Sequence, residues 1–147
     1  MFGNIGSAAP TNPGTGKLYA LTVGDDGRPH ALRRLWESRP NDGPDGFALA
    51  KSGNIYVALA GLGTDQLAKL GPDGTEIARI PATPLDNARM PVPFDEPSGV
   101  TFDGDRLLVT NLSYVAQDPD HWVVFDVFAG ERGVPLFHPS VPANHDR

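Results

Sequence analysis

The sequence contains no cysteine and very little lysine. Among its 147 residues it offers no disulfide, no thiolate ligand for a metal and no cysteine nucleophile. Three of its 12 basic residues are Lys, and no basic stripe forms on a chain whose net charge is −6. Nucleic acids are bound largely through clustered Lys and Arg, so the composition argues against a nucleic-acid partner.

Long apolar runs are absent as well. No stretch approaches the roughly 18 apolar residues that a membrane-spanning helix needs, so we expect no membrane partner. Residues 1–10 have neither a basic start nor an apolar core, and they are not typical of a signal peptide. Without cysteine the redox environment is not indicated either, so the sequence leaves the compartment undetermined.

Glycine and proline, in contrast, are abundant, with 17 and 15 residues. Both interrupt regular structure rather than fill helices. No window has an apolar period of 3.6 residues long enough for a substantial helix. Hydrophobic residues still make up 39% of the chain, which is enough for a folded core. We therefore expect a folded chain of short strands and turns.

Two hairpin types alternate along the chain. Residues 44–58 and residues 97–110, whose starts lie 53 positions apart, both read Pro-x-Gly, short apolar strand, polar turn, second apolar strand. Before, between and after them, residues 17–35, 66–80 and 122–137 read strand, turn rich in Asp or Gly, strand. Four short strands in each unit of about 50 residues are typical of β-propeller blades.

The sequence thus predicts an all-β fold, a partial β-propeller of about three blades of four-stranded antiparallel sheet. A single domain, residues 1–147, would contain blade portions at roughly 1–36, 43–81 and 95–138 and a tail at 139–147, with residues 1–13 adding an inner strand. Fewer than four blades cannot close a ring. Open blade faces predict self-association. The chain is then a fragment of a longer one, which is the simpler interpretation, or one of two copies that form a ring.

The motifs in these units resemble a known family. Asp42–Gly46, Ser52–Ala58 and Leu70–Pro81 resemble the senescence-marker-protein/gluconolactonase/luciferin-regenerating-enzyme family. In that family a blade opens with Pro-Asp-Gly, continues into a strand with the pattern Gly-x-hydrophobic-aromatic-Val-Ala, and ends on Ile-Pro or Leu-Pro. The resemblance covers roughly residues 15–112 and implies the C-terminal half of a six-bladed propeller.

The resemblance implies a metal-dependent hydrolase that opens sugar lactones and holds one divalent cation, calcium or zinc, in its central channel. It assigns to Asp45 the roles of metal ligand and catalytic proton carrier. A carboxylate is a good ligand for a hard cation and can shuttle a proton. One repeat later the same position is Ser98, so the fold does not demand an acid there. The alternative is a turn residue that bonds to its own backbone.

Other polar positions are typical of loops and turns. We expect turns or loops at Asp25–Gly27, Asn41–Gly43, Pro72–Gly74 and Asp103–Asp105. Gly61–Gly63 lacks the third glycine of a dinucleotide site, and no Gly-x-Ser-x-Gly elbow is present. His30, His121, His138 and His145 form no zinc-binding pair, and His121 with Trp122 is expected to open a strand. Asn111, Ser113 and Tyr114 end an inner strand pair and either line the channel or cap a loop.

Function is limited by what one carboxylate can do. The Glu and Asn ligands that the resemblance implies on earlier blades have no counterpart in this chain, and calcium takes about six to eight oxygen ligands. We therefore expect a lactonase-like fragment that is inactive or weak alone and acts on a small-molecule lactone only where the parent site is complete. The alternative is a non-catalytic propeller module, similar to NHL-repeat or strictosidine-synthase-like proteins, that binds a protein or ligand.

Overall fold

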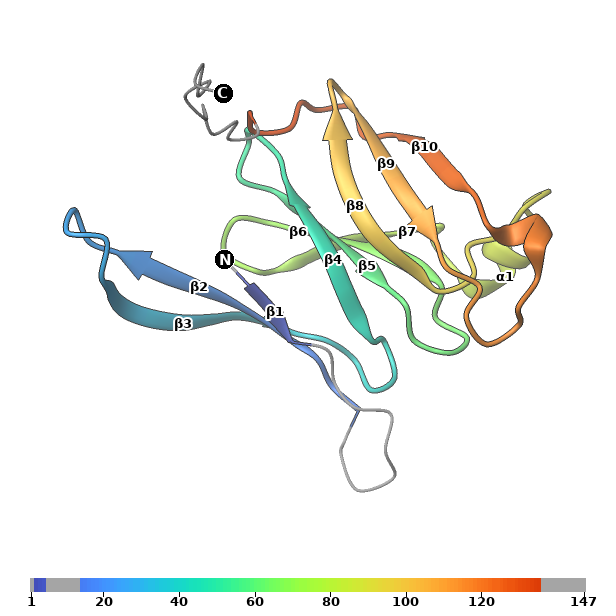
Figure 1. The fold of residues 1–147 in the computed structure, drawn as a ribbon, viewed down its shortest axis with the longest axis horizontal. Coiled ribbons are helices and arrows are strands. Elements are labelled where there is room, and N and C mark those ends of the chain that lie inside the picture. Colours follow the sequence, from blue (N-terminus) through green and yellow to red (C-terminus); the bar gives the residue numbers. More distant parts are fainter. Residues whose placement is uncertain (1, 5–13, 136–147) are drawn as a thin grey trace, which may run out of the picture.

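The structure is a computed structural model and describes residues 2–4 and 14–135. Its strands form three antiparallel sheets, with the strand orders β1-β2-β3, β4-β5-β6-β7 and β10-β9-β8 (Figure 1). The strands are β1 (Phe2–Asn4), β2 (Lys17–Val23), β3 (Pro29–Glu37), β4 (Pro44–Leu49), β5 (Ile55–Leu59), β6 (Gln66–Leu70), β7 (Glu76–Ile80), β8 (Pro97–Asp103), β9 (Arg106–Asn111) and β10 (Val124–Phe128). The helical elements in the described part are α1 (Pro84–Ala88) and a 3-10 turn (Pro119–His121).

This arrangement confirms the predicted all-β partial propeller. Each sheet is built from sequential strands joined by hairpins, as propeller blades are. The middle sheet has the predicted four strands, whereas the first and third have three within the described residues. Phe2 of β1 pairs with Tyr19 of β2, so the N-terminal stretch adds the expected strand. No helix in residues 2–4 and 14–135 is long and apolar enough to cross a membrane.

One predicted strand begins later than expected. The side chain of Asp118 caps a 3-10 turn that ends at His121, and β10 begins only at Val124. The expectation that His121 and Trp122 open a strand was therefore wrong. The Asp118 side chain accepts the Asp120 amide at 3.0 Å and so caps the 3-10 turn. This local hydrogen bonding competes with strand pairing and keeps the stretch out of the sheet.

The final predicted strand also differs, over the residues that the structure describes. Gly133 forms an isolated bridge with Ala50, and the Val134 amide donates to the Leu49 carbonyl at 3.0 Å. The chain after β10 thus runs back to the last residues of β4, the inner strand of the middle sheet. It does not add a fourth strand beside β10. Residues 136 and 137 of that expected strand lie outside the described residues.

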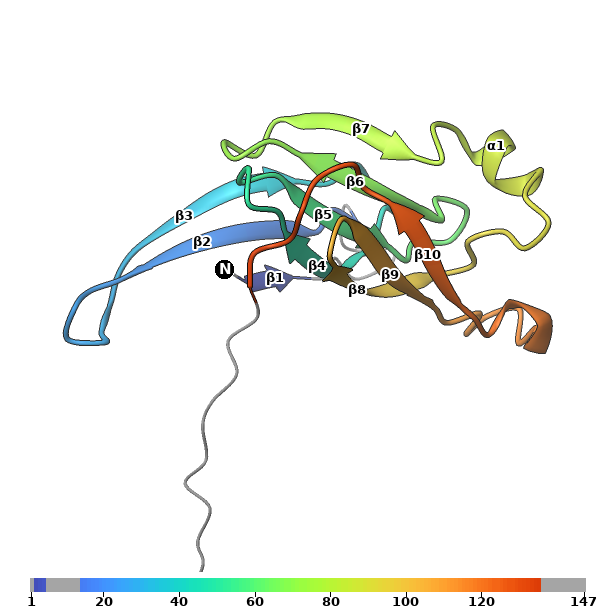
Figure 2. The same ribbon diagram turned by 90° about the horizontal axis from the view of Figure 1, so that it is seen from above.

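The strands β1, β4 and β8 are the inner strands of the three sheets. They lie in a row in Figure 2, with β3, β7 and β10 toward the outside, and β4 contacts both of its neighbours. The approach of β4 to β8 requires a glycine, because a side chain on Gly46 would collide with the backbone of Ser98 and Gly99. The Gly in the Pro-x-Gly opening of this blade is thereby explained by packing between sheets.

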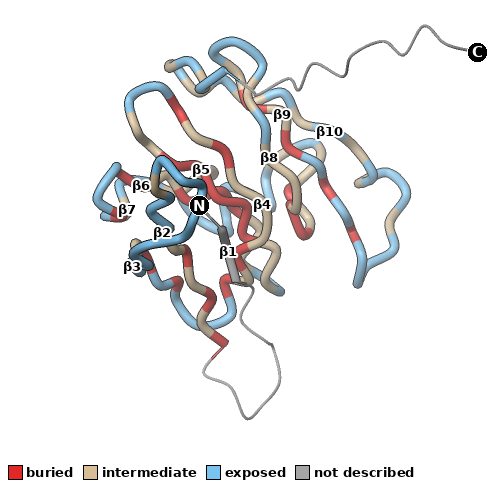
Figure 3. The backbone as a smooth tube through the Cα atoms, turned by 60° about the vertical axis from the view of Figure 1, so that its left-hand side comes forward, coloured by how far each residue is buried: buried red, intermediate tan, exposed pale blue. Residues whose placement is uncertain are grey.

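The core lies on both faces of the middle sheet. Ile55, Val57 and Leu59 of β5 pack toward the first sheet, whereas Tyr56 and Ala58 pack toward the third. All five are at most 1% exposed. A strand covered on both faces reads as a continuous apolar run, which explains why β5 lacks alternation. Figure 3 shows the buried segments concentrated in the middle of the molecule and an exposed β2–β3 hairpin.

Glu131 fastens the segment after β10 to the middle sheet. Its carboxylate accepts hydrogen bonds from Tyr56 Oη at 2.7 Å, Asn54 Nδ2 at 2.9 Å and the Ser52 hydroxyl. Lys69 Nζ lies 2.8 Å away and forms an ion pair. Burial alone would raise the pKa of Glu131, but these donors outweigh it and lower the pKa to about 2. The third sheet is therefore held to the second by polar as well as apolar contacts.

Candidate functional site

Asp45 lies at a break in the strand pairing at the start of β4. The ladder with β5 is regular from Phe47 to Leu49 but shifts register between Pro44 and Phe47, so Asp45 sits inside the irregular stretch. Such bulges re-aim side chains and are frequent beside functional sites. β4 is the inner strand of its sheet, so the structure places Asp45 where the sequence predicted an inner-strand carboxylate.

The same irregularity recurs one repeat later. β8 shifts register between Pro97 and Val100, which makes Ser98 the structural counterpart of Asp45. The Ser98 hydroxyl lies 3.0 Å from Thr110 Oγ1, which also accepts the next backbone amide at 2.7 Å. The same backbone irregularity thus forms around a neutral side chain that is hydrogen-bonded to the neighbouring strand. The fold therefore does not require an acid at position 45.

The Asp45 carboxylate is half-buried and makes no hydrogen bond or ion pair with residues 14–135. Burial acts on it unopposed and raises its pKa above the ordinary range. Asp73 shows the contrast, because it accepts the Thr75 amide at 2.9 Å and has a lowered pKa. Asp45 therefore does not behave as the turn-capping residue of the alternative interpretation. Its oxygens are available to bind a cation or accept a proton.

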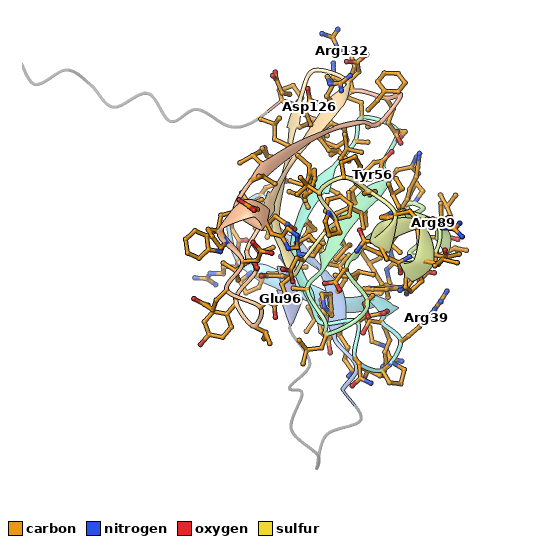
Figure 4. All side chains as sticks on the ribbon, turned by 90° about the vertical axis from the view of Figure 1, so that its right-hand side faces the viewer. Arg39, Tyr56, Arg89, Glu96, Asp126 and Arg132 are labelled. Carbon is orange, nitrogen blue, oxygen red and sulfur yellow. The ribbon has the colours of Figure 1, made fainter. Side chains whose placement is uncertain are left out.

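Three loops, residues 60–65, 89–96 and 112–123, meet at the end of the molecule where β4 and β8 begin. We call them the rim loops. The Glu96 amide donates to Asp65 Oδ1 at 2.9 Å, and the buried Glu96 carboxylate accepts the Val115 amide at 2.9 Å. Figure 4 shows Glu96 at this end and Arg132 at the opposite end. The rim loops are thus joined to each other by specific polar contacts.

Asp95 is the centre of a second set of contacts in the rim. It accepts the Ser113 hydroxyl at 2.6 Å and lies 2.9 Å from His121 Nδ1. Burial would raise the pKa of Asp95, but these two partners outweigh it and lower the pKa. The Asp95 contact raises the pKa of His121 against the effect of burial, with further help from Asp118 and Asp120. The pair thus favours a charged histidine facing a charged carboxylate.

Two of the three residues that end the inner strand pair prove to be loop caps. Asn111 is buried, accepts the Asp95 amide at 2.8 Å and donates to the carbonyls of Pro93 and His121. Ser113 is fully buried and bonded to Asp95. Tyr114 instead is 69% exposed, so it is the member of this trio that a ligand can reach.

Asp42, which the sequence places in a loop, belongs to a buried ion pair. Its carboxylate bonds both terminal nitrogens of Arg79 at 2.7 and 2.9 Å, and both side chains are less than a tenth exposed. The preceding Asn41 adopts a positive φ of 66°, which is typical of loops. No local signal identifies the Asp42 pair, since its partner lies 37 residues away.

The remaining polar candidates lie where the sequence placed them or outside the described part. Gly27, Gly74 and Gly104 have positive φ at the predicted turns. Gly61 packs so closely on the loop of residues 41–43 that a side chain would collide with it. His30 is exposed on β3 and His121 lies in the rim, while His138 and His145 lie outside the described residues.

Comparison with known proteins gives a fold neighbour. No family model and no curated protein matches the sequence. The solved structure of the calcium-binding protein regucalcin from Agrobacterium tumefaciens strain C58 matches with a TM-score of 0.59 and 23% identity. The match covers 94% of this chain and 48% of that one, so the chain spans about half of that protein's length. At this identity the likeness shows a shared fold.

A complete cation site is not present in the described residues. No group of three or more His, Cys, Asp or Glu in residues 2–4 and 14–135 is arranged to hold a metal ion. Asp45 supplies one carboxylate, whereas calcium takes about six to eight oxygens. The rim carboxylates of Asp95 and Glu96 already accept protein donors. The described residues therefore supply at most one carboxylate, Asp45, to a divalent-cation site, and they do not complete one.

Proposed function

We propose that this chain is part of a divalent-metal-dependent hydrolase that opens small lactones, and that Asp45 is its proton-carrying carboxylate and one of its metal ligands. The observation that carries the proposal is the half-buried Asp45 carboxylate on an inner strand, which has no partner among residues 14–135. Ser98, which occupies the equivalent backbone position in β8, is neutral and is hydrogen-bonded to Thr110. The calcium-binding character of the fold neighbour regucalcin supports the metal part of the proposal.

The proposed chemistry is a balanced hydrolysis. A water oxygen attacks the lactone carbonyl carbon while Asp45 accepts the water proton, and the raised pKa of Asp45 makes it a stronger base for this transfer. The bond from the carbonyl carbon to the ring oxygen then breaks. Asp45 returns the proton to that oxygen, which leaves an open-chain hydroxy acid. The residues that complete the metal site are proposed to come from beyond this chain.

We expect divalent cations to stabilise the chain weakly, through Asp45. Thermal unfolding with and without calcium or zinc should show a small rise in Tm for the native chain and none for Asp45→Asn. Asp73→Asn, a turn carboxylate, is the matched control and should keep the rise. Because one carboxylate cannot hold a catalytic cation, lactone hydrolysis by the purified chain should remain at background. Metal-dependent hydrolysis abolished by Asp45→Ala would contradict the incomplete site, and an equal Tm rise in Asp45→Asn would contradict the ligand role.

One observation favours a second function, a propeller face that binds a protein or ligand without catalysis. The rim carries exposed apolar side chains, with Leu112, Tyr114, Val115 and Trp122 between 48% and 69% exposed. Exposed aromatic and aliphatic side chains gathered on one loop are typical of binding surfaces. This alternative gains if Asp45→Asn leaves cation-dependent stabilisation unchanged.

A further inference from the structure

We infer that Arg79, on the outer strand β7, is a positioning residue for Asp45, because through Asp42 it fixes the loop of residues 41–43 from which β4 begins. The residues that carry this inference belong to the middle sheet and the loops beside it, and described residues cover both faces of that sheet. The meaning of the inference for catalysis rests on the proposed function. The structural link from Arg79 to Asp45 does not.

Arg79 and Asp42 form a buried pair in which the arginine is fully engaged. Arg79 Nη1 and Nη2 donate to the two carboxylate oxygens of Asp42 at 2.9 and 2.7 Å, and the two side chains are 8% and 4% exposed. Arg79 Nε and Nη2 also donate to Glu76 at 3.0 and 3.1 Å, and Nη1 donates to Gln66 Oε1 at 3.4 Å. A planar guanidinium bonded in this way holds a carboxylate in one orientation.

Asp42 connects this pair to the backbone of the loop. Its Oδ2 accepts the Arg39 amide at 2.9 Å in addition to the Arg79 contact, so one carboxylate joins β7 to the chain that enters the loop. The loop needs such support, because Asn41 and Gly43 on either side of Asp42 have positive φ angles of 66° and 56°. A residue other than glycine keeps such an angle where the surrounding structure imposes it.

The loop is joined in turn to the chain that follows β5. The Gly61 amide donates to the Asp42 carbonyl and the Ala60 amide donates to the Gly43 carbonyl, both at 2.9 Å. These bonds continue the β4–β5 pairing past the start of β4. A side chain on Gly61 would collide with the carbonyl oxygen of Asn41, so the two segments are in close contact. The position of the loop therefore sets where β4 begins.

Asp45 depends on this loop because no contact holds its side chain directly. It has no hydrogen bond or ion pair with residues 14–135, so the backbone decides where the carboxylate lies. Toward the C-terminus, Gly46 packs against β8 and the regular ladder resumes at Phe47. Toward the N-terminus the support is the loop, in which Asp42 lies three residues before Asp45. Small displacements of a reacting group cost large factors in rate, so this support matters for the proposed proton transfer.

The third sheet contains the same loop with a different partner for its aspartate. Asp95 lies 53 positions after Asp42, and the Ser113 amide donates to the Asp95 carbonyl at 2.9 Å as the Gly61 amide does to the Asp42 carbonyl. The Asp95 carboxylate, however, bonds to the Ser113 hydroxyl and to His121. An aspartate thus anchors this loop in both sheets. In the middle sheet its partner is an arginine, which stays charged over the whole range in which histidine titrates.

The test is the pKa of Asp45 in Arg79 variants, measured by carbon-13 NMR of the carboxyl groups in the metal-free chain. Burial, and not a neighbouring charge, raises the pKa of Asp45, so a change in that pKa reports a change in how the backbone buries the group. In Arg79→Gln we expect the pKa of Asp45 to fall toward 3.8 and amide hydrogen exchange at Ala60 and Gly61 to accelerate. Arg79→Lys keeps a charged partner for Asp42 without the two-pronged contact and should show a smaller fall.

Glu76→Gln is the matched control. Glu76 accepts hydrogen bonds from Arg79, as Asp42 does, but it makes no contact with the backbone of the 41–43 loop among the described residues. The substitution therefore weakens the same arginine network and leaves the Asp42 contact in place. The pKa of Asp45 and the exchange of the Ala60 and Gly61 amides should stay at their native values.

Two results would overturn the inference. One is a native pKa for Asp45 in folded Arg79→Gln and Arg79→Lys, and the other is an equal change in Glu76→Gln. Circular dichroism checks folding, and Arg79→Lys decides if Arg79→Gln unfolds. If both unfold, the pair supports the whole sheet rather than Asp45, and the inference is wrong.

The response of the native Asp45 resonance to calcium separates this inference from the proposed function. A shifted pKa in the Arg79 variants without a calcium response in the native chain would contradict the metal-ligand role of Asp45 and leave the positioning link intact. A calcium response in the native chain with an unchanged pKa in the folded Arg79 variants would contradict the positioning link alone.

Discussion

Glu131 joins two sheets through side chains that lie far apart in the sequence. Its partners Ser52, Asn54, Tyr56 and Lys69 all belong to the middle sheet or its turn, at least 62 positions earlier. The carboxylate is largely buried and its pKa falls to about 2 because the partners stabilise the charged form more than burial opposes it. Such a group links folding stability to pH.

We predict that Glu131→Gln lowers the free energy of unfolding at neutral pH by about 3 kcal/mol, because a pKa lowered from 4.5 to about 2 corresponds to that amount of charge stabilisation. A lowered folded-state pKa stabilises the fold above the unfolded pKa. In the native chain this stability should therefore be lost as pH falls from about 4.5 toward 2, and the variant should lose less. Urea unfolding across this range measures both effects.

Glu37→Gln is the control for that experiment. Glu37 also has a lowered pKa, from its hydrogen bond with Thr15, but it lies at the surface, where solvent weakens such interactions. It should change stability and acid sensitivity far less than Glu131→Gln. Equal losses in the two variants would mean that the contacts of Glu131 do not hold the sheets together.

For single residues, the sequence predicts where a candidate side chain lies in the fold better than it predicts which side chains it contacts. Asp45 could be singled out because its Pro-Asp-Gly opening resembles that of a known family. Ser98 at the same position one repeat later shows that the fold does not demand an acid there, and the structure gives both positions the same backbone irregularity. The Asp42–Arg79 pair and the contacts of Glu131 could not be found, because they depend on which distant strands become neighbours. A local pattern carries no information about such contacts.

The loop between β9 and β10 is the element with the clearest pH-sensitive contact. His121 is set against Asp95 at 2.9 Å and Asp118 at 3.8 Å, and Asp120 lies in the same 3-10 turn. The Asp95 contact raises the pKa of His121 above 6.5, so the charged histidine stabilises the folded loop. A raised folded-state pKa gives stability below the unfolded value, and this stability is lost as pH rises through the folded value.

We predict that raising the pH past the His121 pKa loosens the loop, and that His121→Gln removes this pH dependence. Amide hydrogen exchange at Val115 and Asp118 reports the change, because these amides donate to Glu96 and Ser113 within the rim. Their exchange, corrected for intrinsic base catalysis, should accelerate across the titration in the native chain only.

His30→Gln supplies the comparison for this loop, since His30 is exposed on β3, far along the chain from the rim. It should leave the pH dependence intact. Protection that does not change through the His121 titration, or that changes equally in His121→Gln, would contradict the role assigned to the Asp95–His121 contact.

The strands that belong to repeated hairpins could be predicted from the sequence. The start of a strand could not be predicted where a side chain caps the preceding turn. The hairpins of β4–β5, β6–β7 and β8–β9 follow from apolar runs around turn residues, and the structure contains all three. The late start of β10 was missed, because side-chain capping by Asp118 competes with strand pairing over residues 118–123. The stretch at 133–134 joins the middle sheet through backbone contacts that alternation does not predict.

The whole molecule is an arc of three sheets with a core on both sides of the middle one. This architecture follows from the repeat, because each unit is too thin to bury its faces and must stack on its neighbours. The fold neighbour spans about twice the length, which agrees with an arc that covers half of a ring. The sequence predicts the arc but not what closes it, since closure depends on surfaces rather than on periodicity.

The central claim is that the arc holds Asp45 as a half-buried carboxylate with no partner among residues 14–135, which we propose transfers a proton and binds a metal. Its pKa can be measured by carbon-13 NMR of the side-chain carboxyl groups as a function of pH, with Asp73 as an internal reference. We predict a pKa for Asp45 above 3.8, because burial is unopposed, and below 3.8 for Asp73. Adding calcium should perturb the Asp45 resonance and leave that of Asp73 in place. A pKa for Asp45 at or below 3.8, with no response to calcium, would contradict the account.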